Sequence, residues 1–252
     1  RPAEYRGSIV MLQSGTTYEI QLTAGSATST ILATTWTDSE KLPIAKTVTF
    51  SGGNISESGT ATGYILYTGA AISGGVNISA SYVIVRGLTI KGGSSHAVSV
   101  TGNHVILERN DISGWGPACS GHTPCGELIA GVQLNTSSQV TIQRNKIHHP
   151  AGNANDSCDP SDYTHHKGPR AVSSSPGAVN NVIRYNDIYS DMDHLFNDTM
   201  GNNNNFSYGG FPNRDTDING NIFSYSADDN PELEGANMNV RFWGNFVDRS
   251  FT

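Results

Sequence analysis

A short strand unit that ends in asparagine recurs along the chain, and no other feature constrains the fold as much. The marker asparagines are Asn110, Asn145, Asn186, Asn221 and Asn245. Each follows a stretch rich in β-branched residues and precedes an apolar residue by one or two positions. The intervals between markers are 35, 41, 35 and 24 residues, and Leu88 takes the marker position 22 residues before Asn110. A unit of about two dozen residues with longer inserts is typical of solenoids.

Asparagine suits a turn between two strands because it tolerates left-handed backbone and bonds to nearby main chain. In a stack of coils, each amide also meets its counterpart about 4.8 Å above and below, which predicts an internal ladder of asparagine side chains. We therefore expect an all-β chain folded as a right-handed parallel β-helix with inserted loops. The alternative is a β-sandwich with unrelated turn asparagines, which the repeated flanking pattern disfavours.

A second strand precedes most of these units, at residues 97–102, 131–134, 171–174 and 232–235. The two-residue period of a strand predicts which side chains share a face. Those expected to point inward are Val98, Val132, Val172 and Leu233, and those expected to point outward onto one shared sheet are Ser99, Gln133, Ser173 and Glu234. We expect residues 7–20 to form the opening strand and turn of the same solenoid.

Composition and charge favour one β-rich domain over residues 1–252 and narrow the range of partners. Only 15% of residues are charged, and the formal net charge of -7 argues against a nucleic-acid partner. No apolar run approaches the roughly 20 residues of a membrane span, so we expect no membrane partner. The absence of an initial Met suggests a processed N-terminus. The last marker, Asn245, lies only seven residues before Thr252, so no polar segment follows to cover the edge of the final coil. Truncation or an oligomeric partner would explain this, and the oligomeric state stays open.

Three cysteines bear on the compartment. Cys119 and Cys125 enclose a short loop, which favours a disulfide in an oxidising environment. A zinc site that uses His122 and Cys158 is the alternative. Six Asn-x-Ser/Thr sequons fit a secreted, extracellular protein.

The chain resembles a known family at three places. These are the opening Gly-Ser-Ile-Val-Met-Leu from Gly7, the repeated Arg-Asn-x-Ile units, and the late segment from Asp228 to Asn245. Together they are similar to secreted right-handed parallel β-helix proteins of the pectate-lyase-like superfamily. The resemblance implies a polysaccharide partner, but that superfamily contains hydrolases, lyases and non-catalytic solenoids. The chain has an Asp-Asp motif but neither the Gly-His-Gly nor the Arg-Ile-Lys motif of polygalacturonase-type hydrolases after it, so their mechanism does not carry over.

Two acidic segments occupy corresponding places in successive coils, which predicts that their carboxylates converge. The candidate catalytic residues are Asp193, Asp198, Asp229, Glu232 and Glu234. Crowded carboxylates split their pKa values, so that one stays protonated as an acid while another is ionised as a base. The alternatives are a calcium site, with Asp191 and Asp228 as further ligands, and a solvated acidic surface.

Basic and aromatic residues near these segments are candidates for substrate binding: His165, His166, Lys167, Arg170, His194, Arg241 and Trp243. Lys167 or Arg170 could also take a proton from a uronic acid. The neighbouring pair His148 and His149 is expected to be a poor metal site because adjacent strand residues point to opposite faces. Trp115 is among the aromatic residues that could stack on sugar rings.

These residues favour an extracellular enzyme that cleaves glycosidic bonds of a polysaccharide by carboxylate acid/base hydrolysis. No cofactor is required for that chemistry, although calcium is compatible with it. The alternatives are a calcium-dependent polyuronate lyase and a non-catalytic β-solenoid that binds carbohydrate.

Overall fold

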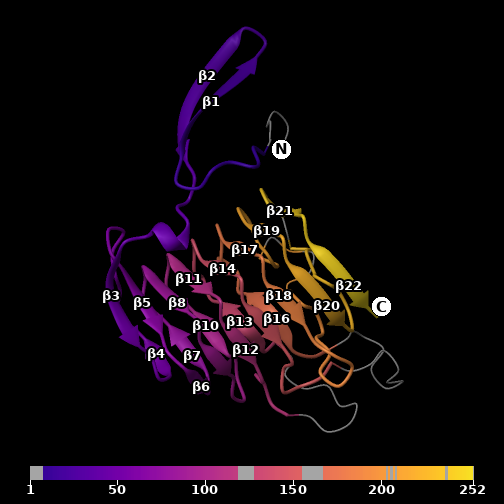
Figure 1. Cartoon of the computed structure of the whole chain (residues 1–252). Helices are drawn as coiled ribbons and strands as arrows, with labels where there is room; N and C mark the ends of the chain where they lie inside the picture. Colours follow the sequence, from indigo (N-terminus) through magenta and orange to yellow (C-terminus); the bar gives the residue numbers. More distant parts are fainter. Residues whose placement is uncertain are drawn as a thin grey trace. The chain divides into compact units, whose positions relative to one another are not determined.

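A computed structural model describes residues 8–118, 128–154, 167–202, 204, 207, 209–235 and 238–251, and its regular structure is almost entirely β (Figure 1). The described residues contain one 3-10 turn, η1 (Ser39–Lys41), and no helix among them is long and apolar enough to cross a membrane. The chain divides into two compact units, Arg1–Pro43 and Ile44–Thr252. The single domain expected over residues 1–252 stays a prediction.

The first unit contains an antiparallel β-hairpin. Strands β1 (Thr17–Ala24) and β2 (Ala27–Thr34) pair antiparallel, and each has no other partner strand among the described residues. Gly25 adopts a φ of 62° in the turn between them, a conformation that glycine reaches without steric cost. The role expected for residues 7–20 as the opening strand of the solenoid is therefore wrong, because strand periodicity is the same in a hairpin and in a coil.

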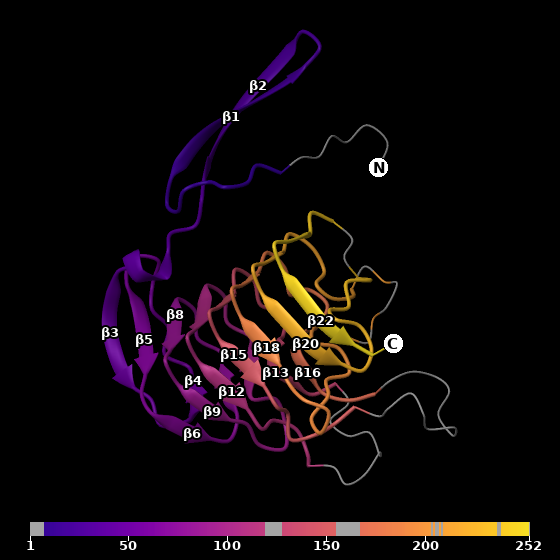
Figure 2. The ribbon, with the colours of Figure 1, turned by 45° about the vertical axis from the view of Figure 1, so that its right-hand side comes forward.

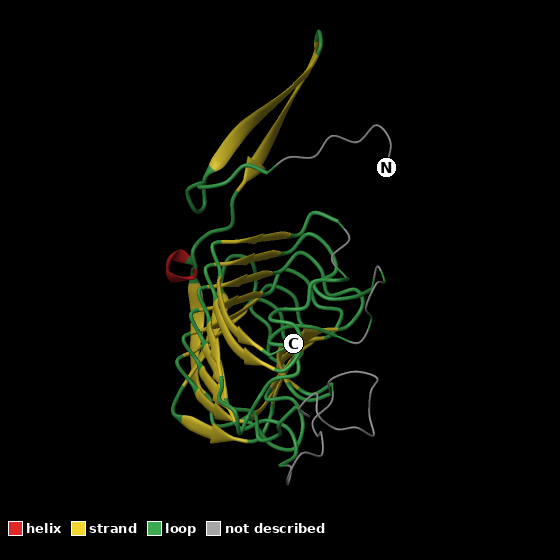
Figure 3. Ribbon diagram, turned by 90° about the vertical axis from the view of Figure 1, so that its right-hand side faces the viewer, coloured by secondary structure: helices red, strands yellow, loops and turns green. Residues whose placement is uncertain are grey.

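The second unit consists of three parallel sheets (Figures 2 and 3). The five-stranded sheet contains β4 (Gly53–Ile55), β7 (Val76–Ile78), β10 (Val98–Val100), β13 (Ala130–Leu134) and β16 (Arg170–Ser174). The eight-stranded sheet contains β3 (Ile44–Thr49), β5 (Tyr64–Thr68), β8 (Val83–Arg86), β11 (Val105–Glu108), β14 (Thr141–Gln143), β17 (Val182–Arg184), β19 (Asp217–Asn219) and β21 (Arg241–Trp243). The seven-stranded sheet contains β6 (Ala71–Ser73), β9 (Thr89–Lys91), β12 (Asp111–Ser113), β15 (Lys146–His148), β18 (Asp187–Tyr189), β20 (Ile222–Ser226) and β22 (Phe246–Ser250).

The chain visits the sheets in a fixed order, and we call one circuit a coil. The coil β8, β9, β10 is followed by β11, β12, β13 and then by β14, β15, β16, and each strand pairs in register with its equivalent in the next coil. All-β architecture and parallel sheets are thus confirmed.

The core lies between the sheets and is built from columns of equivalent apolar residues. One column is Ile90, Ile112, Ile147, Ile188 and Phe223, and another is Val98, Val132 and Val172. All of these are buried. The inward direction predicted for the three valines is confirmed.

The predicted asparagine ladder runs through the turns between the eight-stranded and seven-stranded sheets. The Asn110 amide donates to Asn145 Oδ1 at 3.1 Å, and the same bond links Asn145 to Asn186, Asn186 to Asn221 and Asn221 to Asn245, at 3.0, 2.9 and 3.0 Å. Each residue before a ladder position has a positive φ: Gly87, Arg109, Arg144, Tyr185, Gly220 and Gly244. A left-handed residue therefore precedes the ladder position in each of these coils.

The five-stranded sheet continues irregularly past β16. Val172 forms a parallel bridge with Met200, and the Glu232 N–H donates to the Met200 carbonyl at 2.9 Å. In the next two coils, the segments that continue this sheet form no regular strand, and these segments carry acidic residues of both predicted clusters.

Candidate active site

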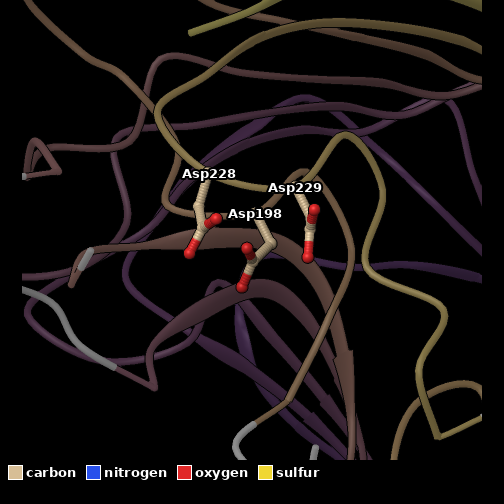
Figure 4. A group of neighbouring side chains, drawn as sticks. All are labelled: Asp198, Asp228 and Asp229. Atoms are coloured by element: carbon tan, nitrogen blue, oxygen red, sulfur yellow. The ribbon is translucent and has the colours of Figure 1, made fainter. Parts of the chain in front are cut away.

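Carboxylates from these two coils converge beyond β16. Asp198 belongs to the first of them, and Asp228 and Asp229 belong to the second. One oxygen from each carboxylate lies within 4.8 Å of the others (Figure 4). Asp198 is buried, whereas Asp228 and Asp229 are half-buried. The predicted convergence of the two acidic segments is thus present for three of their residues.

Asp198 is fixed by two donors. Arg170 on β16 donates from Nε to Asp198 Oδ2 at 2.8 Å, and the Asn197 amide donates to the same oxygen at 2.8 Å. The pKa of Asp198 is raised, mainly by burial and also by the neighbouring Asp228. The charge and hydrogen bond of Arg170 and the hydrogen bond of the Asn197 amide oppose this rise. Because the Arg170 and Asp198 side chains are only 7% and 3% exposed, removing either leaves the other charge buried, at a cost of about 3–5 kcal/mol.

Glu232 is the fourth carboxyl group of the site and is only 4% exposed. Its Oε2 accepts a hydrogen bond from the Asn202 N–H at 3.2 Å. Burial, reinforced by Asp198, raises the pKa of Glu232 to about 8, against the lowering effects of Arg170 and the Asn202 N–H. Glu232 is therefore mainly protonated at neutral pH.

Gly201 allows Glu232 and Asp198 to approach each other. A Cβ atom at this position would lie 2.2 Å from Glu232 Oε2 and 3.0 Å from Asp198 Oδ2. Real Cβ contacts are longer than the first of these distances, so any other residue here would displace the Glu232 carboxyl. We call Asp198, Asp228, Asp229 and Glu232 the carboxyl cluster.

Two buried polar atoms beside the carboxyl cluster have no hydrogen-bond partner among the described residues: Arg170 Nη1 and Asn197 Oδ1. Arg170 is 6% exposed and Asn197 is 1% exposed. Leaving such groups unpaired costs about 1–3 kcal/mol each, a cost that a bound ligand, ion or water would remove. The first offers a charged donor and the second offers an amide oxygen.

A row of uncharged polar side chains leads along the five-stranded sheet to the cluster. It comprises Asn54, Asn77, Ser99, Gln133 and Ser173, which are register partners in adjacent strands. They alternate with core residues along each strand and so share the outer face; Asn54 and Asn77 are exposed, Ser99 is half-buried, and Gln133 and Ser173 are buried. Because Val172 is bridged to Met200, Gly201 follows Ser173 in the row, and Glu232 Oε2 lies beside Gly201. We call this the polar row.

The other acidic candidates lie outside the cluster. Asp193 is exposed, and its N–H donates to Asp191 Oδ1 at 3.0 Å. Glu234 is exposed as well, beyond the segment that hydrogen-bonds to Met200. Asp191 Oδ2 lies 3.3 Å from His149 Nε2 and not in the set that contains Asp228. Leu233, expected to point inward, is half-buried and packs against the core.

The basic and aromatic candidates are dispersed. Arg170 pairs with Asp198 of the carboxyl cluster, and Lys167, three residues before Arg170 in the sequence, is half-buried. Arg241, on β21 of the eight-stranded sheet, pairs with Asp217 on the neighbouring strand β19, and Trp243 is exposed on β21. Trp115 is completely buried in the core, so it cannot stack on a sugar. His165, His166 and the three cysteines with His122 lie outside the described residues.

His148 and His149 do not point to opposite faces, contrary to the expectation from strand periodicity. His148 ends β15, and His149 follows it with a φ of 45°, which breaks the alternation. As a result the two Nδ1 atoms lie 2.8 Å apart. Tyr189 stacks on His148, and the rings of His149 and His194 lie 5.9 Å apart.

Three residues of the site escaped sequence-based reasoning: Asn197, Gly201 and Asn202. Asn197 and Asn202 orient the carboxyl groups of Asp198 and Glu232, and Gly201 leaves room for both. Their proximity to Asp198 in the sequence is the one signal that could have identified them. Comparison with protein-family models, curated proteins and solved structures finds no match to this chain.

Proposed function

We propose that this chain is a right-handed parallel β-helix enzyme that hydrolyses glycosidic bonds of an extracellular polysaccharide at the carboxyl cluster. The observation that carries the proposal is the convergence of Asp198, Asp228, Asp229 and Glu232 at the end of the polar row. Glycoside hydrolysis needs a protonated carboxyl group beside an ionised one. A buried Glu232 next to half-buried aspartates supports both states in one site.

The geometry suggests a role for each carboxyl group. Glu232, whose pKa is raised to about 8, is the proton donor to the leaving oxygen. Asp228 and Asp229 are the more accessible groups and act on the sugar or on water. Asp198 is held in place by Arg170 beside the other carboxyl groups.

The polar row supports a neutral rather than an acidic polymer. Its five described side chains are amides and hydroxyls without charge, and they recur at the strand spacing of about 4.8 Å. Such groups exchange hydrogen bonds with sugar hydroxyls. Uronate carboxylates would instead favour a row of arginine or lysine.

The test is incubation of the protein with a panel of neutral and acidic polysaccharides. We expect new reducing ends from a neutral polysaccharide, without the ultraviolet absorbance of unsaturated uronates. New absorbance with an acidic polymer would identify a lyase instead. Binding without new ends would leave the third alternative, a non-catalytic carbohydrate-binding solenoid.

Calcium binding is a second candidate function of the same cluster, and a specific observation favours it. Three carboxylate oxygens lie within 4.8 Å of one another, beside the unpaired Asn197 Oδ1, and calcium prefers such oxygen ligands. A lyase would use the ion with Lys167 or Arg170 as base. Calorimetry with calcium on the intact protein and on Asp228→Asn separates the readings, since only a calcium site loses binding in the variant.

A further inference from the structure

The imidazoles of His148 and His149 form a pair that is independent of the carboxyl cluster. Their Nδ1 atoms face each other at 2.8 Å, and both side chains are partly exposed, at 18% and 35%. Such a contact needs an electrophile between the rings, because two lone pairs directed at one point repel each other. Either a shared proton or a metal ion meets that need.

A carboxylate stands behind each ring. His148 Nε2 lies 2.9 Å from Asp111 Oδ1, and His149 Nε2 lies 3.3 Å from Asp191 Oδ2. A hydrogen on each Nε2 is therefore favoured, which turns both Nδ1 lone pairs toward the shared point. Metal-bound histidines have this arrangement, since the outer carboxylate fixes the tautomer and makes the ligand more basic.

His194 provides a third imidazole. Its ring lies 5.9 Å from that of His149, and its Nδ1 is buried without a hydrogen-bond partner among the described residues.

We propose that His148, His149 and His194 form a binding site for a divalent transition-metal ion with the preferences of Zn²⁺. Zinc–nitrogen bonds of about 2.0–2.1 Å in a tetrahedral site place two nitrogens about 3.3 Å apart. The Nδ1 atoms of His148 and His149, now 2.8 Å apart, must therefore move apart by about half an ångström. The ring of His194 must also turn, because the one set of three ligand atoms already within 4.8 Å among the described residues is Asp198, Asp228 and Asp229. Imidazole selects zinc over calcium and magnesium, which the oxygen ligands of the carboxyl cluster suit better.

The experiment is calorimetric titration of the chelator-treated intact protein with Zn²⁺. We expect one equivalent to bind at micromolar concentration or tighter. The double variant His148→Gln/His149→Gln loses that equivalent, and His194→Gln weakens it at least tenfold. Asp111→Asn weakens binding by about 10–100-fold, because it removes only the carboxylate behind His148.

Matched controls separate this site from other histidines and from the proposed function. His104→Gln alters a histidine that stacks on Tyr82, and Asp198→Asn alters the carboxyl cluster, and both keep the zinc equivalent. Circular dichroism checks that each variant folds. Unchanged stoichiometry and affinity in the double histidine variant, or unchanged affinity in Asp111→Asn, would overturn the proposal, and loss of hydrolysis in Asp198→Asn would leave it standing.

Discussion

At the scale of residues, the carboxyl cluster depends on a buried carboxyl group whose pKa is raised by burial and by a neighbouring carboxylate. Glu232 is buried next to Asp198 and keeps its proton at neutral pH, and Gly201 supplies the space in which the two groups meet. A buried ionisable group whose pKa is shifted in the folded state makes stability depend on pH. The raised pKa of Glu232 therefore makes the free energy of unfolding depend on pH.

Stability should fall as the pH rises from about 5 to about 8. The folded-state pKa of Glu232 is raised to about 8 from an ordinary value of 4.5. A raised pKa means that the folded protein binds the proton more tightly, so the contribution is complete below the ordinary value and is lost as pH rises through the folded value. Glu232→Gln cannot ionise, so its stability relative to wild type should increase over this range by a few kcal/mol at most.

Urea unfolding of both proteins between pH 5 and 9 measures this difference. Glu234→Gln is the matched control, because Glu234 is exposed and should follow the wild-type curve. Parallel stability curves for wild type and Glu232→Gln would show that Glu232 ionises normally in the folded protein.

Single residues also mark where sequence reasoning fails. The histidine pair was expected to point to opposite faces, but the left-handed backbone of His149 turns both rings together. Glu232 and Glu234 looked equivalent in sequence, whereas only Glu232 lies where the chain hydrogen-bonds to Met200. Local backbone conformation decided both cases, and side-chain periodicity does not contain it.

At the scale of elements, the asparagine ladder fixes the register between coils. Each interior asparagine donates to a main-chain carbonyl and to the next amide, and accepts from the preceding turn, as Asn145 does with Leu107, Asn186 and Asn110. The ladder could be predicted because its spacing recurs in sequence. The hairpin of β1 and β2 could not, because its alternating pattern equally fits a coil.

The cost of breaking the ladder should depend on position. Asn145→Ala removes the acceptor of the buried Asn110 N–H and a donor to the Leu107 carbonyl, which should lower the free energy of unfolding by about 2–5 kcal/mol. Asn245→Ala, at the partly exposed end of the ladder, should cost about 1 kcal/mol because water can replace the lost bonds. Urea unfolding compares the two variants, and equal costs would contradict a buried ladder.

At the scale of the whole molecule, the stacking of successive coils brings residues that are distant in sequence together in the carboxyl cluster. Three parallel sheets align equivalent residues of successive coils, so the polar row meets acidic residues that are 30 or more positions apart in the chain, such as Asp198 and Asp228. The repeat predicted that the acidic segments meet. It could not predict which acids do so, because the segments beyond β16 leave regular strand geometry.

The measurement that tests the central claim most directly is the rate of reducing-end release from the best polysaccharide of the panel, with Glu232→Gln and Glu234→Gln compared to wild type. Loss of the proton donor should lower kcat by about 10²–10⁴-fold in Glu232→Gln, since general acid catalysis contributes that much. Glu234→Gln, an exposed glutamate two residues away, should retain wild-type activity. Full activity in Glu232→Gln, or an equal loss in both variants, would contradict the account.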